Sequence, residues 1–351
     1  MEARFYKKLK QQTVICESCQ HFCTLLPGEF GKCGVRQNQN GKLISLVYGR
    51  VSALGIDPIE KKPFYHFLPG SFAYSFGTIG CNFACLFCQN WQLSQVSKKN
   101  PPLFEGVQEE RIKLALKEAR NLTPKEIVSE AQRFNCQSIA YTYNEPTVFS
   151  EFALETAQEA KKAGLKNLWV SNGFFSERVL KEVINLVDAI NIDLKSFKDP
   201  TYQEVSRARL EPVLKNISAL KKAGVWVEVT TLLIPSLNDS SQELKEIAQF
   251  LVDISPEIPW HLSAYWPAYL ASWPATSLED LEKAYKIGKK AGLYYVYIGN
   301  LPSEKENTYC PNCQKLLIRR EGYFIWENHL SANKCPFCQT KIAGVWRKDS
   351  K

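Results

Sequence analysis

The chain has 351 residues, of which 45% are hydrophobic and 23% are charged, and its formal net charge is +8. These values are ordinary for a globular protein with a sizeable core, built as one large domain or two to three smaller ones. No run of about 18 apolar residues is present, which excludes a predicted membrane span, and the charged start lacks a signal-peptide core, so we expect a cytoplasmic protein. Lys and Arg are interleaved with Glu, which favours a solvated surface over a nucleic-acid-binding face.

Twelve cysteines are many for a protein of a reducing compartment, where disulfides are unfavourable, so metal binding is the better explanation. Eleven of them fall into three groups. Cys136 stands alone between a predicted helix and a predicted strand, and we expect it to be a small buried hydrophobic residue. The groups divide the chain into an N-terminal module (1–70), a central segment (71–300) and a C-terminal module (301–351).

The N-terminal module carries a C-x2-C-x3-C-x9-C pattern with glycines around it and a short predicted strand at 42–47. Such a small knuckle cannot bury enough apolar surface alone, so we expect a bound metal to stabilise its fold. Spacing leaves structural zinc and an auxiliary 4Fe-4S cluster both open. The four expected ligands are Cys16, Cys19, Cys23 and Cys33.

The central segment opens with a predicted strand at 72–79, and three cysteines in a C-x3-C-x2-C pattern follow it: Cys81, Cys85 and Cys88. A cubane iron–sulfur cluster normally takes four thiolates, so three local thiolates would leave one iron open to a small molecule. The alternatives are a zinc site that borrows a distant ligand, or three packed thiols.

Beyond the trio, apolar runs alternate with amphipathic helical patterns. This alternation predicts an α/β fold with a parallel sheet, helices outside it and a site at the carboxyl ends of the strands. Six such units are too few for a closed eight-stranded barrel, so we expect a partial (βα)6 barrel. The expected strands are 138–143, 167–171, 189–194, 225–234, 260–265 and 294–298. One expected helix begins at Thr123, and the others cover 148–163, 177–187, 212–223, 242–252 and 278–291.

Two further stretches complete the pattern. Residues 89–122 include a polar, proline-marked run at 98–102, which predicts a lid, a binding loop or disorder. The C-terminal module contains two C-x2-C knuckles about twenty residues apart, with a predicted hairpin between them. Four thiolates at this spacing indicate a tetrahedral zinc site, and a rubredoxin-like mononuclear iron site has the same ligands. These ligands are Cys310, Cys313, Cys335 and Cys338.

The cysteine trio at the end of the first strand of an α/β alternation resembles the radical S-adenosylmethionine (radical SAM) superfamily. Further motifs occur in one order along nearly the whole chain, at 141–147, 191–195, 260–263, 299–300 and 307–313, and together they resemble the radical SAM component of the AmmeMemoRadiSam system. That group is similar to pyruvate formate-lyase activating enzymes. The resemblance implies a radical SAM barrel and a 4Fe-4S cluster on Cys81, Cys85 and Cys88, where SAM is cleaved to a 5′-deoxyadenosyl radical.

The resemblance also implies which strand-end residues contact SAM. Asn144 and Glu145 stand where the family has a Gly-Gly-Glu-like turn that binds the SAM amino group, and Glu145 could instead be a charge at a helix start. Ser171 and Asn172 stand in an element similar to Asp-Thr-Asn-Gly, or form a simple tight turn. Val170 replaces the acidic residue of that element, which puts any cation bound through it in doubt.

The later strands supply the remaining candidates. Asp193 and Lys195 share one face of their strand and match an Asp-x-Lys that the family uses for SAM and substrate, or they form a structural salt bridge. Leu233 and Ile234 either pack against the adenine of SAM or belong to the hydrophobic core. His261 is a SAM or substrate contact or a satisfied structural histidine, and Tyr265 relays a radical or lines the pocket.

The expected function is therefore that of a radical SAM enzyme acting on a substrate that the residues do not disclose. A glycyl-radical enzyme activase is the alternative, and a non-catalytic, metal-rich binding module is a third hypothesis. The expected electron donor is ferredoxin or flavodoxin. Memo-like and AMMECR1-like partners are implied by the resemblance alone.

Overall fold

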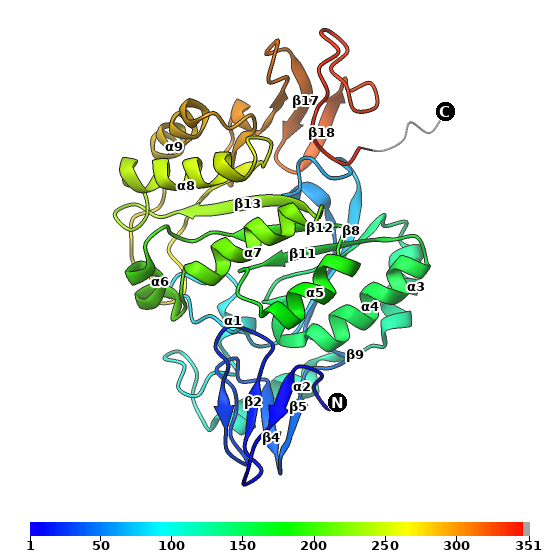
Figure 1. Ribbon diagram of the computed structural model, residues 1–351, viewed down its shortest axis with the longest axis vertical. Helices are drawn as coiled ribbons and strands as arrows, with labels where there is room; N and C mark the ends of the chain where they lie inside the picture. Colours follow the sequence, from blue (N-terminus) through cyan, green and yellow to red (C-terminus); the bar gives the residue numbers. More distant parts are fainter. Residues whose placement is uncertain (347–351) are drawn as a thin grey trace.

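The seven strands that the alternating pattern predicts lie side by side in one sheet of the computed structural model, which describes residues 1–346 (Figure 1). They pair in parallel, and their order is β15-β14-β13-β12-β11-β10-β8. The α/β class and the parallel sheet are thus confirmed, while the six-unit barrel stays a prediction. The strands are β8 (Phe72–Gly77), β10 (Ser138–Tyr141), β11 (Lys166–Ser171), β12 (Ala189–Asp193), β13 (Trp226–Leu233), β14 (Trp260–Ala264) and β15 (Val296–Gly299).

An eighth strand, β7 (Ala53–Pro58), pairs antiparallel with β8 and forms an edge of this sheet. The sequence pattern places β7 in the N-terminal module, yet its hydrogen bonds join it to the central segment. The short helix η1 (Ile59–Lys61) follows it. The division at residue 70 therefore stays a prediction, and the chain crosses from one segment to the other near residue 52.

The predicted helices are present between the strands, and glycines end three of them in the left-handed region as expected: Gly164, Gly224 and Gly292. The helices are α3 (Pro124–Arg133), η2 (Pro146–Phe149), α4 (Ser150–Lys162), α5 (Glu177–Leu186), α7 (Glu211–Lys222), α8 (Ser241–Ile254) and α9 (Leu278–Ala291). Thr123 forms the predicted capping box with Glu126.

Three α-helices were not predicted. Residues 89–122 are not a plain loop, because α1 (Trp91–Ser94) and α2 (Gln108–Glu118) lie in them. Helix α2 buries only Ile112, so its charged pattern gives little apolar period to read. Helix α6 (Asp199–Ser206) follows β12 and starts at Asp199-Pro200, with proline in its first turn as helix starts favour.

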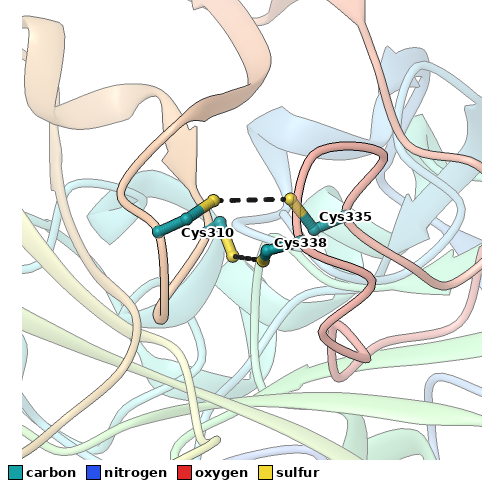
Figure 2. Close-up of side chains that lie close together, drawn as sticks. Cys310, Cys335 and Cys338 are labelled. Atoms are coloured by element: carbon teal, nitrogen blue, oxygen red, sulfur yellow. Dashed lines mark hydrogen bonds between the residues drawn. The ribbon is translucent and has the colours of Figure 1, made fainter.

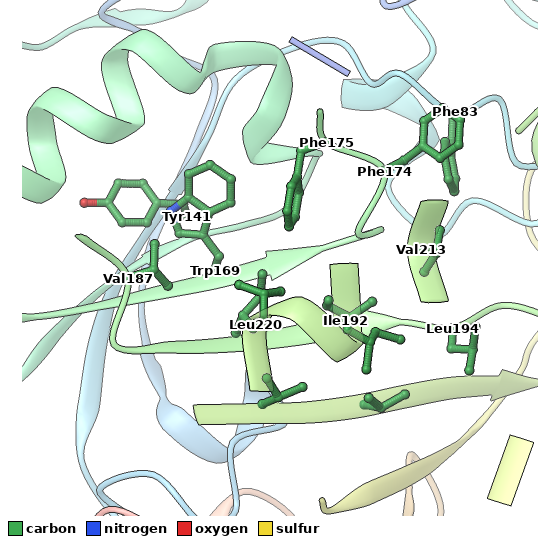
Figure 3. Close-up of a cluster of buried hydrophobic side chains, with 14 of the residues drawn as sticks. Phe83, Tyr141, Trp169, Phe174, Phe175, Val187, Ile192, Leu194, Val213 and Leu220 are labelled. Carbon is green, nitrogen blue, oxygen red and sulfur yellow. The ribbon is translucent and has the colours of Figure 1, made fainter. Parts of the chain in front are cut away.

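The main core fills the space between the sheet and its helices (Figure 3). Trp169, Ile192 and Leu220 are fully buried in it. This core continues to the cysteine trio, because Phe83 from the trio's loop packs edge-on against Phe174, with ring centroids 5.3 Å apart. The loop that carries the cysteines is therefore anchored in the same apolar cluster that holds the sheet.

The N-terminal module lies at one end of the molecule (Figure 1). It docks on the central segment through a buried ion pair, in which Arg36 donates to both Glu151 oxygens at 2.6 and 2.9 Å. A bridge between Cys19 and Phe175 adds backbone contacts. Its strands are β1 (Tyr6–Lys8), β2 (Val14–Cys16), β3 (Thr24–Leu25), β4 (Arg36–Gln39) and β5 (Lys42–Ser45), and β6 (Arg50–Val51) pairs with β9 (Arg120–Asn121).

The C-terminal module lies at the opposite end (Figure 1). It contains η3 (Glu304–Glu306) and the strands β16 (Thr308–Tyr309), β17 (Leu316–Glu321) and β18 (Phe324–Asn328), so the predicted hairpin is present. Buried Arg320 joins it to the rest by donating to the Tyr65 carbonyl at 2.9 Å. None of the helices described in residues 1–346 has the length and apolar content that crossing a bilayer requires.

Candidate active site and metal centres

The cysteine trio lies in the loop between β8 and α1, at the carboxyl edge of the parallel sheet, where a site is expected. The Cys85 thiol is buried and donates to Ser206 Oγ at 3.3 Å, and Cys88 Sγ lies 3.1 Å from Ser94 Oγ. Cys81 Sγ accepts the Phe83 N–H at 3.4 Å. Each sulfur is therefore held by a neighbouring donor or acceptor.

The unpredicted helix α6 supports this loop. The Ser206 carbonyl at its end accepts the Ala84 N–H at 3.0 Å, and the Val205 carbonyl accepts the Leu86 N–H at 2.9 Å. Arg207 then ends the helix in the left-handed region. Sequence reasoning missed Ser206 because its partner, Cys85, lies 121 residues away along the chain.

Asn144 holds the backbone that leads into the trio. Its amide donates to the Gly80 carbonyl at 2.7 Å and to Thr78 Oγ1 at 3.1 Å, and its Oδ1 accepts the Thr78 N–H at 3.1 Å. Gly77 permits this approach, since a Cβ there would lie 2.3 Å from the Thr142 carbonyl oxygen. Asn144 therefore orients the cysteine loop, and the predicted SAM contact stays a prediction.

Glu145 ties the ends of β10 and β11 together. Its buried carboxylate accepts from the hydroxyls of Thr147 at 2.6 Å and Ser171 at 2.9 Å, and from the backbone N–H groups of Thr147 at 3.1 Å and Asn172 at 2.8 Å. Burial raises the pKa of this carboxyl, although these hydrogen bonds oppose the shift. The carboxylate also caps η2, as the helix-start alternative anticipated.

Asn172 connects this pair of strand ends to the cysteine loop. Its Nδ2 donates to Asn82 Oδ1 at 2.8 Å and lies 4.0 Å from Cys81 Sγ, while its Oδ1 accepts the Phe174 N–H at 3.1 Å. The structure thus brings together Glu145, Ser171 and Asn172, and places them beside the first cysteine of the trio.

Asp193 and Lys195 lie at the end of β12, near the second cysteine. Lys195 Nζ is 3.1 Å from Asp193 Oδ2 and 5.8 Å from the ring centroid of Phe87. Burial alone would lower the pKa of Lys195, but the Asp193 carboxylate and the Cys85 sulfur raise it above its ordinary value. The pair is a salt bridge, as the structural alternative held, and it lies next to the trio.

His261 pairs with a buried carboxylate of the neighbouring strand β13. Its Nε2 is 2.6 Å from Glu228 Oε2, and its ring packs against Tyr65 and Tyr297, with centroids 4.8 and 5.3 Å away. Tyr297 continues to Thr308 of the C-terminal module. None of the hydrogen bonds described in residues 1–346 joins His261 to the Glu145 group, which favours the structural alternative for this residue.

Leu233, Ile234 and Tyr265 are fully buried in the main core. Asn238 Oδ1 accepts the Ile234 N–H at 2.7 Å, and Asn238 also donates to the Lys195 carbonyl at 2.8 Å. This end of β13 is therefore packed as core, which was one of its two expected roles.

The C-terminal cysteines form a compact quartet (Figure 2). The sulfurs of Cys310 and Cys338 are 3.5 Å apart, and those of Cys313 and Cys335 are 3.6 Å apart. All four lie within 4.8 Å of one another, and within residues 1–346 this is the only group of three or more His, Cys, Asp or Glu side chains that meets that spacing. The quartet fits a single metal ion, whose thiolates lie about 3.8 Å apart in a tetrahedron.

The trio and the N-terminal quartet are consequently wider than a single-ion site. Cys16 and Cys33 of the N-terminal quartet are buried, and Cys19 and Cys23 are half-buried. For the trio, a wider spread fits a cluster, whose ligand sulfurs stand about 6 Å apart around the cubane. Cys136 is buried in the main core, as predicted.

Comparison with known proteins adds independent findings. A family model described as "Radical SAM superfamily" matches residues 76–251. An uncharacterized protein of Methanocaldococcus jannaschii is 43% identical over 97% of this chain and 98% of its own length. A second protein of that organism, named provisionally as a glycyl-radical enzyme activating enzyme, is 28% identical over 50% of this chain and 66% of its own length. The benzylsuccinate synthase activating enzyme of Thauera aromatica is 28% identical over 30% of this chain and 33% of its own length.

Proposed function

Because the chain belongs to the radical SAM superfamily, we propose that Cys81, Cys85 and Cys88 hold a 4Fe-4S cluster at which it cleaves S-adenosylmethionine reductively to a 5′-deoxyadenosyl radical. The radical abstracts a hydrogen atom from a substrate still to be identified. The family and the relatives named as activating enzymes make the protein an enzyme and set aside the non-catalytic binding module.

One observation carries the proposal: the family match covers the three cysteines at the end of β8, and the strand ends that hold them. Other residues of the chain hold the cysteine loop in position. Asn144 and Asn172 fix the cysteine loop, and the buried contacts of Glu145 hold two strand ends in register with it. Lys195, whose pKa the Asp193 carboxylate and the Cys85 sulfur raise against the effect of burial, places a positive charge beside Cys85.

The test is anaerobic turnover with SAM and dithionite, with 5′-deoxyadenosine measured by chromatography. The reconstituted chain should release it, and Cys85→Ala should abolish release while both terminal metal sites stay filled. Cys136→Ala is the matched control, since it removes a buried thiol outside the three groups and should keep product formation. Equal release by Cys85→Ala and the native chain would overturn the proposal.

Radical SAM enzymes take their electron from a reductant, and we propose that a low-potential ferredoxin or flavodoxin supplies it here. On resemblance alone we also propose Memo-like and AMMECR1-like proteins as partners, with zinc in the C-terminal quartet. Co-purification of a tagged chain with either protein, expressed together, tests the partnership. Metal analysis of the C-terminal quartet tests the zinc.

A second candidate function is activation of a glycyl-radical enzyme, favoured by the names of two relatives. Those relatives match 50% and 30% of this chain. Anaerobic incubation with SAM, reductant and pyruvate formate-lyase should produce the doublet signal of a glycyl radical if this candidate is right. Absence of the doublet, with 5′-deoxyadenosine still released, would remove pyruvate formate-lyase as a substrate and leave SAM cleavage intact.

A further inference from the structure

The four N-terminal cysteines line one small cavity, together with Arg36 and Asn82. The volume of this cavity is about 20 Å³. All four cysteines are free thiols: Cys16 ends strand β2, and the other three lie outside the strands of the N-terminal module. Four thiols that line one cavity are a set of ligands for a metal ion or for a metal cluster.

The separation of the sulfurs distinguishes an ion from a cluster. Thiolates on one tetrahedral ion lie about 3.8 Å apart, as those of the C-terminal quartet nearly do. No three of the N-terminal sulfurs come within 4.8 Å of one another in residues 1–346, where the C-terminal quartet alone meets that spacing. Ligand sulfurs around a cubane cluster stand about 6 Å apart, and this wider arrangement matches a ring of cysteines around a cavity.

Two buried N–H groups in the cavity wall have no acceptor among the described residues. They are Arg36 Nε and Asn82 Nδ2. Arg36 is 1% exposed and Asn82 is 3% exposed, so water does not reach them freely. The remaining nitrogens of Arg36 are engaged by Glu151 and Ser150. An unpartnered buried donor is costly, and the sulfur atoms of a cluster are acceptors for such groups.

His21 also borders the cavity but is committed elsewhere. Its Nε2 donates to the Asn82 carbonyl at 2.9 Å, and its Nδ1 lies 3.5 Å from Lys32 Nζ. The ligand set is therefore the four cysteines alone, one for each iron of a cubane.

We propose that Cys16, Cys19, Cys23 and Cys33 bind a second 4Fe-4S cluster, with Arg36 Nε and Asn82 Nδ2 donating to its sulfur atoms. Because the protein ligates every iron, this cluster has no open corner and does not bind SAM. The inference is independent of the proposed function, since it concerns other residues.

This cavity and the trio share a wall. Asn82 lines the cavity and directly follows Cys81. Lys98 Nζ donates to the carbonyls of both Lys32 and Cys81, and Ser97 Oγ donates to the Cys33 carbonyl at 2.9 Å. The second cluster would therefore lie beside the first, separated by one layer of side chains.

The test removes the trio and asks whether iron remains. A full-length Cys81→Ala/Cys85→Ala/Cys88→Ala chain, purified and reconstituted anaerobically, should hold about four irons and four sulfides. The native chain should hold about eight of each. After reduction, the variant should show the electron paramagnetic resonance signal of a cluster, and added SAM should leave that signal unchanged.

An iron-free triple variant, or one that holds zinc in the N-terminal site, would overturn the proposal. If the triple variant does not fold, Cys19→Ser/Cys23→Ser serves instead: it should lose about four irons and keep a cluster signal that SAM perturbs. Unchanged iron in that chain would equally overturn it. The native chain allows a check without any variant, by metal analysis. A content of about four irons and two zinc ions per chain would contradict a second cluster.

Discussion

The two four-cysteine groups at the ends of the chain use the same ligands and build different sites. The C-terminal sulfurs pair at 3.5 and 3.6 Å, whereas the N-terminal cysteines surround a cavity. Both groups have four thiols, so the number of ligands does not distinguish them. What differs is the separation of the sulfurs, and this separation selects between a single ion and a cluster.

The C-terminal quartet is built from two copies of one local turn. In one knuckle the Cys310 carbonyl accepts the Gln314 N–H at 3.0 Å, and in the other the Cys335 carbonyl accepts the Gln339 N–H at 2.9 Å. Both glutamines adopt a positive φ, of 57° and 60°. The N-terminal site has no such repeat in its spacing, and it depends on Arg36 and Asn82 from outside the knuckle.

The largest expected effect is loss of the C-terminal metal. Cys335→Ser should remove one metal ion per chain and leave the iron content unchanged, because the quartet shares no ligand with the other groups. Structural zinc contributes about 10 kcal/mol or more to the folding of such a module, so β17 and β18 should become protease-sensitive. Metal analysis and limited proteolysis measure this, with Cys136→Ala as the control. A fall in iron would contradict the independence of the two sites.

The next effect tests the anchor of the N-terminal site. Glu151→Gln leaves the buried Arg36 charge without its carboxylate, which should cost about 3–5 kcal/mol in the free energy of unfolding. Glu159→Gln, in the same helix α4, removes only an exposed pair with Lys162 and should leave the free energy of unfolding nearly unchanged. Denaturant titration of both chains compares them. Equal losses would show that the buried pair does not anchor the module.

A smaller effect tests the contact between the N-terminal module and the segment that follows α1. Gly34 has φ of +75°, and a Cβ there would lie 1.8 Å from the Ser97 carbonyl oxygen. Gly34→Ala should therefore cost about 1–3 kcal/mol for the clash, beyond the backbone strain. Gly28→Ala is the matched control, since Gly28 has φ of +88° and open space around it. The two chains should differ in thermal midpoint, and matching midpoints would argue against close packing at Ser97.

The smallest expected effect is a loss of folding stability in acid, caused by a buried histidine beside the C-terminal module. Burial lowers the pKa of His66 to about 4, although Glu228 and the Ala343 carbonyl oppose the shift, and Arg320 and His261 add to it. A depressed folded-state pKa means that stability is complete above the unfolded value of about 6.5 and falls as the pH drops toward 4. Between pH 6.5 and 5 the loss should be about 2 kcal/mol.

Unfolding followed by tryptophan fluorescence measures this loss, because Trp226 stacks on His66 with centroids 6.1 Å apart. His66→Asn removes the titrating group and should flatten the dependence of the unfolding free energy on pH. An unchanged slope in that chain would assign the acid sensitivity to other groups.

Much of the fold was predictable because its signals are local. The strand at Phe72–Gly77 and the capping box at Thr123 follow from neighbouring residues, and so does the hairpin between the C-terminal knuckles. Helix α6 was missed because its apolar period is short, although it supports Cys85 through Ser206. Helix α2 was not predicted because its many charged residues leave little apolar periodicity.

The candidate site divides in the same way. The spacing of Cys81, Cys85 and Cys88 predicts that the three thiols converge, since three ligands within eight residues need no tertiary contact to meet, and the resemblance to the radical SAM superfamily favours a cluster over zinc. The roles of Asn144 and His261 could not be predicted from local spacing. Each has partners from segments far along the chain, so whether it faces a ligand, orients the cysteine loop or pairs with Glu228 depends on packing.

The chain's amino-acid sequence by itself determined the alternation of strands and helices, the three cysteine groups and their ligand type, because side-chain periodicity and ligand spacing act over a few residues. Only the tertiary structure decided how far apart the sulfurs stand, which strand-end residues hold the loop, and that the N-terminal cavity shares a wall with Cys81. Those properties depend on contacts between separate segments, from 22 residues apart for Cys313 and Cys335 to 64 for Ser97 and Cys33, which no local pattern encodes.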